Sequence, residues 1–416
     1  MGEGEFVAAE GTAAVTPAKT DDGGGDDRDG GGSGRQLTAL LTCAMAFSML
    51  QLFLLGALGP RLVAELGVSP AVLGLTTTIG FGTAAVLSPA GGRIVDRIGP
   101  RRSLVALLLV SAVALALIGA APGAALLLAA VALGGVPQAL ANPATNKAVL
   151  RAVPPERRAA VTGLKQSGVQ LGAFAAGAPL ALLAGGIGWR GAVWAGAGAA
   201  LLAGMWALRA LPADPPPGPA GPRTALVPRG MVAWLAAFSL FLGAGIASVN
   251  TYVALFGVQR LGLGPTAAGA LVAVLGVAGI AGRVGWSKAA RPGRAEWLPG
   301  LLAVGALGAA GLLVAAVLVA PLVWLGAVAV GVFAVAGNAV SMVLILQRAA
   351  PGRAGQDSAL VAAGFFAGFA AGPPLFGLLA QRDQYGPAWL LVAAEFAVAA
   401  ATAITWAARD RAGVRR

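Results

Sequence analysis

Residues 102–121 read RSLVALLLVSAVALALIGAA, and Arg102 is the only charged residue among them. At a helical rise of 1.5 Å per residue, such a run crosses the hydrocarbon core of a bilayer, which is about 30 Å thick. Eleven other apolar runs of similar length lie near 37–58, 70–92, 124–149, 158–184, 190–211, 230–256, 265–287, 297–319, 322–346, 357–380 and 387–408. The sequence therefore predicts an all-α membrane protein with twelve transmembrane helices.

The composition of the 416 residues agrees with this fold class, since 57% are hydrophobic and only 11% are charged. Histidine is absent and Cys43 is the only cysteine, which argues against a disulfide framework, a His or Cys metal site and a His-based catalytic triad. No G-x-x-x-x-G-K-[ST] phosphate loop is present, so an ATP-driven pump is not expected. We expect a gradient-driven carrier with no cofactor and no bound metal, and not an enzyme.

The net charge of +12 comes from clusters of basic residues between the apolar runs, a distribution unlike the continuous basic stripe of a nucleic-acid-binding protein. If both termini lie on one side, 24 Lys and Arg residues fall in segments on that side and four, Arg61, Arg190, Arg260 and Arg382, fall on the other. The positive-inside rule then places both termini in the cytoplasm of a multi-pass protein of the cell inner (plasma) membrane.

The chain divides at changes in composition. We expect an acidic, Gly-rich disordered tail (1–36), a six-helix bundle (37–211), a Pro-rich cytoplasmic linker (212–229), a second six-helix bundle (230–408) and a basic tail (409–416). A shift of about 196 residues aligns Asn142 with Asn338, and Gly168 with Gly364. The two bundles are therefore predicted to be pseudo-symmetric.

The loop after the second run reads GGRIVDRIGPRR over residues 91–102. It resembles the G-x-x-x-D-R-x-G-R-[KR] loop of the major facilitator superfamily, with Pro100 as a departure. Asp96 can bond backbone donors of a neighbouring helix, and the arginines can pair with carboxylates or lipid phosphates. The resemblance implies a conformational latch formed by Gly92, Asp96, Arg97, Gly99, Arg101 and Arg102. The alternative is an ordinary basic loop.

The segments NPATNK (142–147) and GLKQSG (163–168) are similar to those of bacterial carriers loosely related to the cyanate and organic-anion transporters. This resemblance implies alternating access for a small-molecule substrate in the lipid bilayer, with proton-coupled uptake of a small organic or inorganic anion. Two alternatives stay open, namely efflux of a drug-like or secondary-metabolite compound by proton antiport and a non-transporting sensor on the same scaffold. We expect a monomer that binds no nucleic acid.

In this superfamily the first, fourth, seventh and tenth spans line the substrate cavity. Polar residues at helical spacing on one face of a span must face protein or water. The candidates for cavity residues are Gln51, Gln138, Asn142, Asn146, Asn250, Tyr252 and Asn338. The alternative is that these side chains form hydrogen bonds between helices.

Of the charged residues inside the predicted spans, three are candidates for a partner or a substrate. Lys165 either extends to the headgroups or points inward, where it would attract an anion. Glu395 lies near the middle of the last span, must be protonated or paired, and is the candidate for proton coupling. Arg283 is a possible partner for a carboxylate.

Glycines recur every four residues in the fifth and eleventh spans, a spacing that places them on one helix face and allows a neighbouring helix to approach closely. The predicted helix-packing glycines are Gly168, Gly172, Gly364, Gly368 and Gly372.

Overall fold

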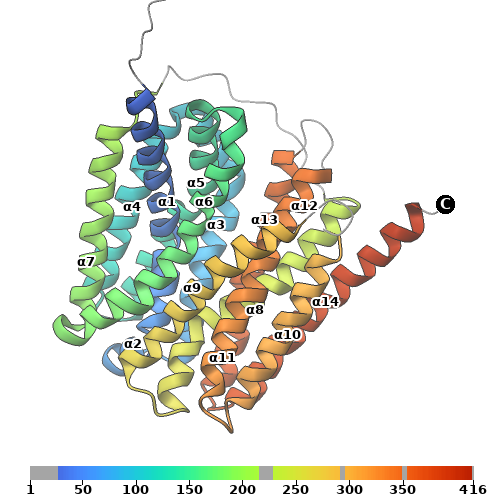
Figure 1. Cartoon of the computed structure of the whole chain (residues 1–416). Coiled ribbons are helices and arrows are strands. Elements are labelled where there is room, and N and C mark those ends of the chain that lie inside the picture. The colour runs from blue at the N-terminus through green and yellow to red at the C-terminus, as the bar shows by residue number, and fades with distance from the viewer. Residues whose placement is uncertain (1–26, 215–227, 291–295, 349–353, 415–416) are drawn as a thin grey trace, which may run out of the picture.

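The computed structural model describes residues 27–214, 228–290, 296–348 and 354–414, and almost all of them are helical (Figure 1). The first part of the chain contains α1 (Asp27–Ala57), α2 (Gly59–Leu66), α3 (Pro70–Ile98), α4 (Pro100–Ala120), α5 (Ala124–Ala152), α6 (Pro155–Ala175), the π-helix η1 (Ala176–Leu180) and α7 (Ala181–Ala210). The second contains α8 (Met231–Gln259), α9 (Pro265–Ala289), α10 (Leu298–Ala315), α11 (Leu322–Ala329), the π-helix η2 (Val330–Val335), α12 (Ala336–Arg348), α13 (Ala354–Ala380) and α14 (Tyr385–Val414).

Within the described residues, eleven helical stretches are long and apolar enough to cross a membrane. One of them, Val161–Ala210, is 50 residues long and is interrupted at Gly188, whose φ of 77° is not helical. A stretch of that length with a break at this position is two spans, which gives the predicted twelve. The short helix α2 was not predicted.

Residues 1–26 of the predicted tail (1–36), 215–227 of the predicted linker (212–229) and 415–416 of the predicted basic tail (409–416) lie outside the described residues. Of the tail, the structure describes the last part, in which α1 begins at Asp27.

The glycine-rich faces bring helices together within each half. A Cβ at Gly172 would lie 2.9 Å from the carbonyl oxygen of Ala46, so α6 packs backbone to backbone on α1. A Cβ at Gly372 would lie 2.5 Å from the carbonyl oxygen of Ala244, and α13 packs in the same way on α8. Gly168 makes an equally close approach to Thr42 on α1, as do Gly364 and Gly368 to α8. The two halves thus repeat one packing arrangement.

The halves meet mainly along α3 with α13 and along α6 with α9. Counted as spans, α3 and α13 are the second and the eleventh, and α6 and α9 are the fifth and the eighth. The second span of one half therefore meets the fifth span of the other half in both pairs. This is the relation expected of pseudo-two-fold symmetry.

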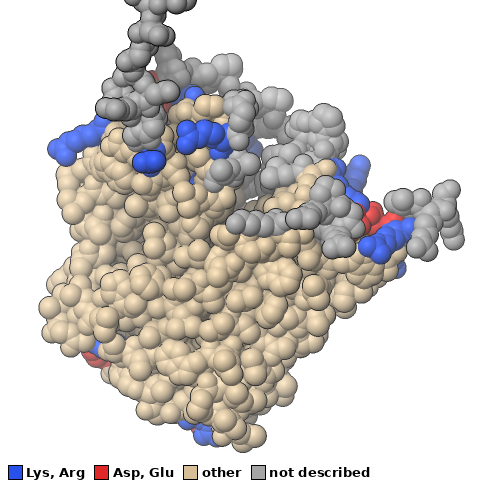
Figure 2. Space-filling view, viewed as in Figure 1, with Lys and Arg blue, Asp and Glu red and all other residues tan. Residues whose placement is uncertain are grey.

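Basic side chains mark one end of the molecule, where Arg97, Arg102, Arg151 and Arg158 lie; we call it the basic end, and the opposite end the far end. In the space-filling view, Lys and Arg gather at the upper, basic end, and the middle of this face is almost free of charge (Figure 2). That uncharged band is the surface expected to face lipid.

Contacts between the halves seal the far end. The Tyr252 hydroxyl donates to the carbonyl oxygen of Pro70 (2.7 Å), and Thr78 Oγ1 donates to that of Ala370 (2.6 Å). The aromatic rings of Phe81 and Phe369 close the same interface nearer the middle, with centroids 4.6 Å apart. The space beside Gly74 is so tight that a Cβ there would collide with the Tyr252 hydroxyl and lie 2.7 Å from the Pro373 oxygen.

We predict that Gly74→Val keeps the far end open, because the added side chain cannot fit between α3, Tyr252 and Pro373. Spin labels at Gly186 and Arg382, introduced as cysteines in a Cys43→Ser background, report the separation of the two halves at that end. The distance distribution should shift to longer values in Gly74→Val. The matched control is Gly82→Val on the same helix, where nothing lies within 4 Å of an added Cβ. Identical distributions for all three proteins would contradict the prediction.

Candidate functional site

Lys165 on α6 is completely buried, with 0% of its surface exposed. Its ammonium group donates to Thr145 Oγ1 (2.7 Å) and to Asn146 Oδ1 (2.5 Å), both on α5. The sequence left open whether the Lys165 side chain extends to the headgroups or points inward. In the structure it points inward. No salt bridge within the described residues involves Lys165, so neutral oxygens stabilise the buried cation.

A second cation reaches α6 from the other half of the molecule, at the residue next to Lys165. Arg283 on α9 donates from Nη1 to the backbone oxygen of Gln166 (3.2 Å), and its Nε is buried without a partner in the described part of the chain. Gln166 donates from Nε2 to Asn142 Oδ1 (2.9 Å). Arg283 therefore contacts a carbonyl group and forms no carboxylate pair among the described residues. The position of Arg283 inside an apolar run was the feature of the sequence that could have placed it in the site.

Two other candidates, Gln51 on α1 and Gln138 on α5, line one small cavity beside Thr77 and Phe81. Gln51 Nε2 lies 3.5 Å from the carbonyl oxygen of Val131, a marginal hydrogen bond. Both amide atoms of Gln138 are buried without a partner in the described structure. The cavity thus holds polar groups that the neighbouring helices do not satisfy.

The remaining candidates lie apart from the lysine. Asn250 is buried, donates to the carbonyl oxygen of Ile246 (2.9 Å) and has an Oδ1 with no described partner. Tyr252 has no exposed surface and belongs to the far-end seal. Asn338 on α12 is half-buried, and its Oδ1 also lacks a described partner. The structure therefore brings together Asn142, Asn146 and Lys165, and separately Gln51 and Gln138.

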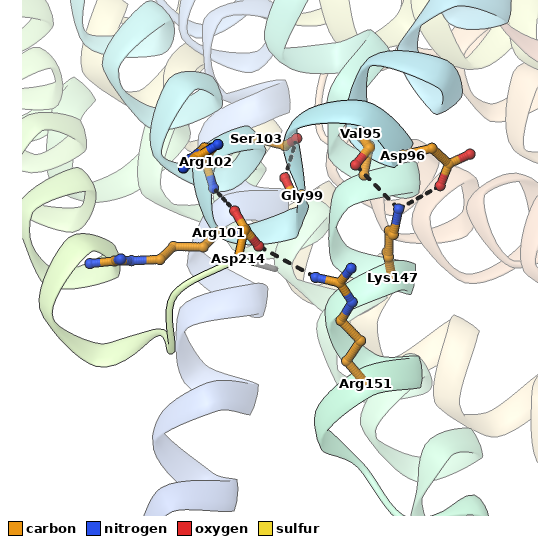
Figure 3. A network of polar contacts seen from close by, with 9 residues as sticks. All are labelled: Val95, Asp96, Gly99, Arg101, Arg102, Ser103, Lys147, Arg151 and Asp214. Carbon is orange, nitrogen blue, oxygen red and sulfur yellow. Dashed lines mark hydrogen bonds and ion pairs between the residues drawn. The ribbon is translucent and has the colours of Figure 1, made fainter. Parts of the chain in front are cut away.

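At the basic end, Asp96 on α3 forms an ion pair with Lys147 on α5 (2.6 Å), and Lys147 also donates to the carbonyl oxygen of Val95 (3.3 Å; Figure 3). The sequence suggested backbone donors of a neighbouring helix as partners of Asp96. The structure assigns it a lysine, and both helices of this pair belong to the first half.

The backbone donors at the start of α4 bind Asp214 instead (Figure 3). Its carboxylate accepts from the N–H groups of Arg101 (3.1 Å) and Arg102 (2.8 Å), and Arg151 Nη1 lies 3.4 Å away. Only 1% of the Asp214 side chain is exposed. Gly99 makes room for it, because a Cβ there would collide with the carboxyl group, and its φ of 91° also favours glycine.

Asp214 was not among the predicted site residues, because it lies in the segment expected to be a linker. The sequence could have indicated Asp214, because it is an acidic residue just after the sixth span in a chain with few acidic residues.

Other members of the predicted latch have looser surroundings. Gly92 has open space on its Cβ side, and Arg97 and Arg102 are exposed. The Arg101 guanidinium donates to the carbonyl oxygen of Leu208 on α7. Arg101 therefore joins the start of α4 to the end of α7 through both its backbone and its side chain.

Glu395 lies in α14, 8% exposed, and its Oε2 is buried with no partner in the described residues. The helix α14 packs on α8, α10 and α13, away from Lys165 on α6. The carboxylate is thus separate from the cationic cluster.

At the basic end of the second half, Arg348 binds Asp410 (2.7 Å) and also Glu296. The hydrogen bond that Arg348 donates to Asp410 and the charges of both acids raise the pKa of Arg348 above its ordinary value. This arginine therefore joins α12, α14 and the segment before α10 at all physiological pH values.

Comparisons with known proteins agree with this architecture. A family model described as the Major Facilitator Superfamily matches residues 41–373. A bacterial homolog of the human lysosomal transporter Spinster, in an inward-facing and unoccupied conformation, superposes with a TM-score of 0.72 at 17% identity, over 92% of this chain and 98% of that one.

Two more solved structures are similar. A mutant of the nucleoside transporter NupG has a TM-score of 0.73 at 13% identity, with 89% of this chain and 99% of that chain covered. The human organic anion transporter MFSD10 (TETRAN) has a TM-score of 0.68 at 15% identity, with the same coverage. At these identities the likeness concerns the fold alone. No curated protein sequence matches the chain.

We predict that Asp214→Asn lowers the free energy of unfolding by about 1–3 kcal/mol, since it weakens charge-assisted hydrogen bonds at a buried position. Thermal unfolding of the purified protein in detergent measures the loss. Asp383→Asn is the control, because Asp383 is exposed and lies 3.8 Å from Arg260, where an ion pair contributes little. Equal unfolding temperatures for the two variants would contradict a structural role for Asp214.

Proposed function

The chain belongs to the major facilitator superfamily, and on this premise we propose that it is a secondary transporter that moves a small anion across the cell inner membrane by alternating access. The observation that carries the anion assignment is a pair of cations, Lys165 buried on α6 against α5 and Arg283, which reaches α6 from the other half. Neither forms a salt bridge within the described residues, so both can bind an incoming negative charge.

The two cations belong to different halves, and this division supports alternating access. An anion bound between Lys165 on α6 and Arg283 on α9 draws the halves together at that level and compensates a desolvated charge on each side. Release of the anion leaves two like charges at the interface, a state that favours separation. We propose that residues 37–211 and 230–408 move as the two bodies of this cycle.

The orientation follows from the charge distribution. We propose that the basic end faces the cytoplasm, with both termini on that side, because the basic residues cluster there. In this orientation the far-end seal closes the outer side, and the structure represents a conformation closed to the outside.

Proton-coupled uptake is the proposed direction, with Glu395 as the candidate coupling group. Support comes from its burial in a transmembrane helix and from its Oε2, which has no partner among the described residues. An ionised carboxylate in that setting is costly, so the carboxyl group favours binding a proton. The alternative, efflux of a drug-like or secondary-metabolite compound by proton antiport, receives no support from Lys165 and Arg283 when that compound is a cation, because like charges repel.

We predict that Lys165→Met reduces uptake of carboxylates into proteoliposomes by roughly a hundredfold, because an anion loses the partner that compensates its desolvation. Lys165→Arg should retain part of the activity, since it keeps the charge. The control is Arg382→Gln, which removes an exposed arginine at the far end. Unchanged uptake in Lys165→Met would remove this residue from the site.

We also propose that the pair of Asp96 and Lys147 acts as a latch during the cycle. Asp96→Asn should slow the transport rate while the protein still folds and inserts, because the Asp96 side chain is 54% exposed and its ion pair contributes little to stability. Transport rate and thermal stability, measured on the same preparation, separate the two effects. A variant with normal turnover would exclude the latch role.

A further inference from the structure

Gln138 on α5 has a buried side-chain amide that neighbouring protein atoms leave unsatisfied. The residue is 4% exposed, and neither Oε1 nor Nε2 has a partner in the described structure. An unpaired buried amide costs free energy, so such a group calls for an occupant that the helices do not supply.

The amide opens onto a cavity of about 10 Å³, which Gln51, Thr76, Thr77, Gly80 and Phe81 also line. This volume accommodates about one water-sized group. Thr76 and Thr77 already use their hydroxyls, in hydrogen bonds to Leu73 O (2.7 Å) and Thr251 Oγ1 (3.0 Å). Among the lining groups, the Gln138 amide is the one whose donor and acceptor both lack a described partner.

The pocket is aligned with the cationic site along one helix. Gln138, Asn142 and Asn146 follow each other at intervals of four residues on α5, so each step is about 6 Å along the axis. Asn142 binds Gln166, and Asn146 binds the Lys165 ammonium. A ligand with its charge near Lys165 and its other end at Gln138 would extend along this face over about two helical turns.

We propose that the Gln138 pocket binds an uncharged hydrogen-bonding group, such as a hydroxyl, at the end of an organic anion whose charged group lies between Lys165 and Arg283. The proposal rests on the anion transport proposed above and narrows it to elongated organic anions, in preference to compact inorganic ones. A glutamine amide both donates and accepts, and a hydroxyl group can satisfy both functions at once.

The pocket then determines specificity. An anion with an apolar end would leave the Gln138 amide buried and unpaired, and sites built around a hydrogen bond discriminate strongly against ligands that cannot form it. The same anion with a terminal hydroxyl would form hydrogen bonds with the Gln138 amide.

The test compares 6-hydroxyhexanoate with hexanoate as ligands of the full-length protein in detergent, by their effect on thermal unfolding as a function of concentration. The proteins are the wild type, Gln138→Leu, Gln347→Leu and Lys165→Met. Gln347 is the matched control, because its amide donates to Ala290 O (3.1 Å) on the opposite half of the molecule, away from the pocket.

We expect 6-hydroxyhexanoate to bind wild type and Gln347→Leu roughly tenfold more tightly than hexanoate, and Gln138→Leu to bind the two acids equally. If the wild type binds the two acids equally and Lys165→Met binds neither, the pocket assignment is overturned, with water as the occupant of the cavity. The anion site at Lys165 would still stand. No stabilisation of the wild type by either acid would overturn both proposals.

Discussion

A lysine ammonium without exposed surface inside a membrane protein must be surrounded by oxygen atoms, and this requirement organises the centre of the molecule. Thr145 and Asn146 supply two of those oxygens from α5, so α5 and α6 are fixed relative to each other at the level of Lys165. Gln166 continues the network to Asn142 and, through its carbonyl oxygen, to Arg283 on α9. One polar network therefore joins three helices and both halves.

Glycine makes the rest of the architecture compatible with movement. The approaches of α6 to α1 and of α13 to α8 are backbone contacts that stabilise each half internally. Between the halves, glycines also allow close backbone contacts, as at Gly56 against Asn250, and the far-end seal adds a few hydrogen bonds and aromatic rings, including Tyr252 and Phe81. Two bodies that rock about a central site must each keep their internal packing while the contacts between them break and re-form.

The linker also has a structural role at its beginning. Asp214 occupies the position at the start of α4 where helix N–H groups lack partners, and Gly99 gives it access. The glycine of the sequence motif thus serves a carboxylate from a distant segment, while the acid of the motif, Asp96, pairs with Lys147. Together these contacts tie α3, α4, α5 and the end of the first half into one unit.

Hydropathy predicted the twelve spans because membrane insertion imposes a length and a composition on each of them. The motif loop predicted the family, and Gly99 gives one physical reason for the motif, because its positive φ and missing Cβ admit Asp214. The sequence could not show that Lys165 turns inward, that Arg283 meets Gln166 or that Asp214 reaches α4, because these depend on how helices rotate and pack. Tyr252, considered as a cavity residue, lies in the far-end seal, since rotation about the α8 axis decides which face is presented.

The central claim is that a substrate anion binds the two cations at the interface. It is tested most directly by the transient current of proteoliposomes adsorbed to a supported membrane, recorded during concentration jumps of small organic anions and, separately, of lipophilic cations. The account predicts a saturable current with organic anions that depends on the positive charge at Lys165, and none with the cations. A saturable current with lipophilic cations alone would contradict it.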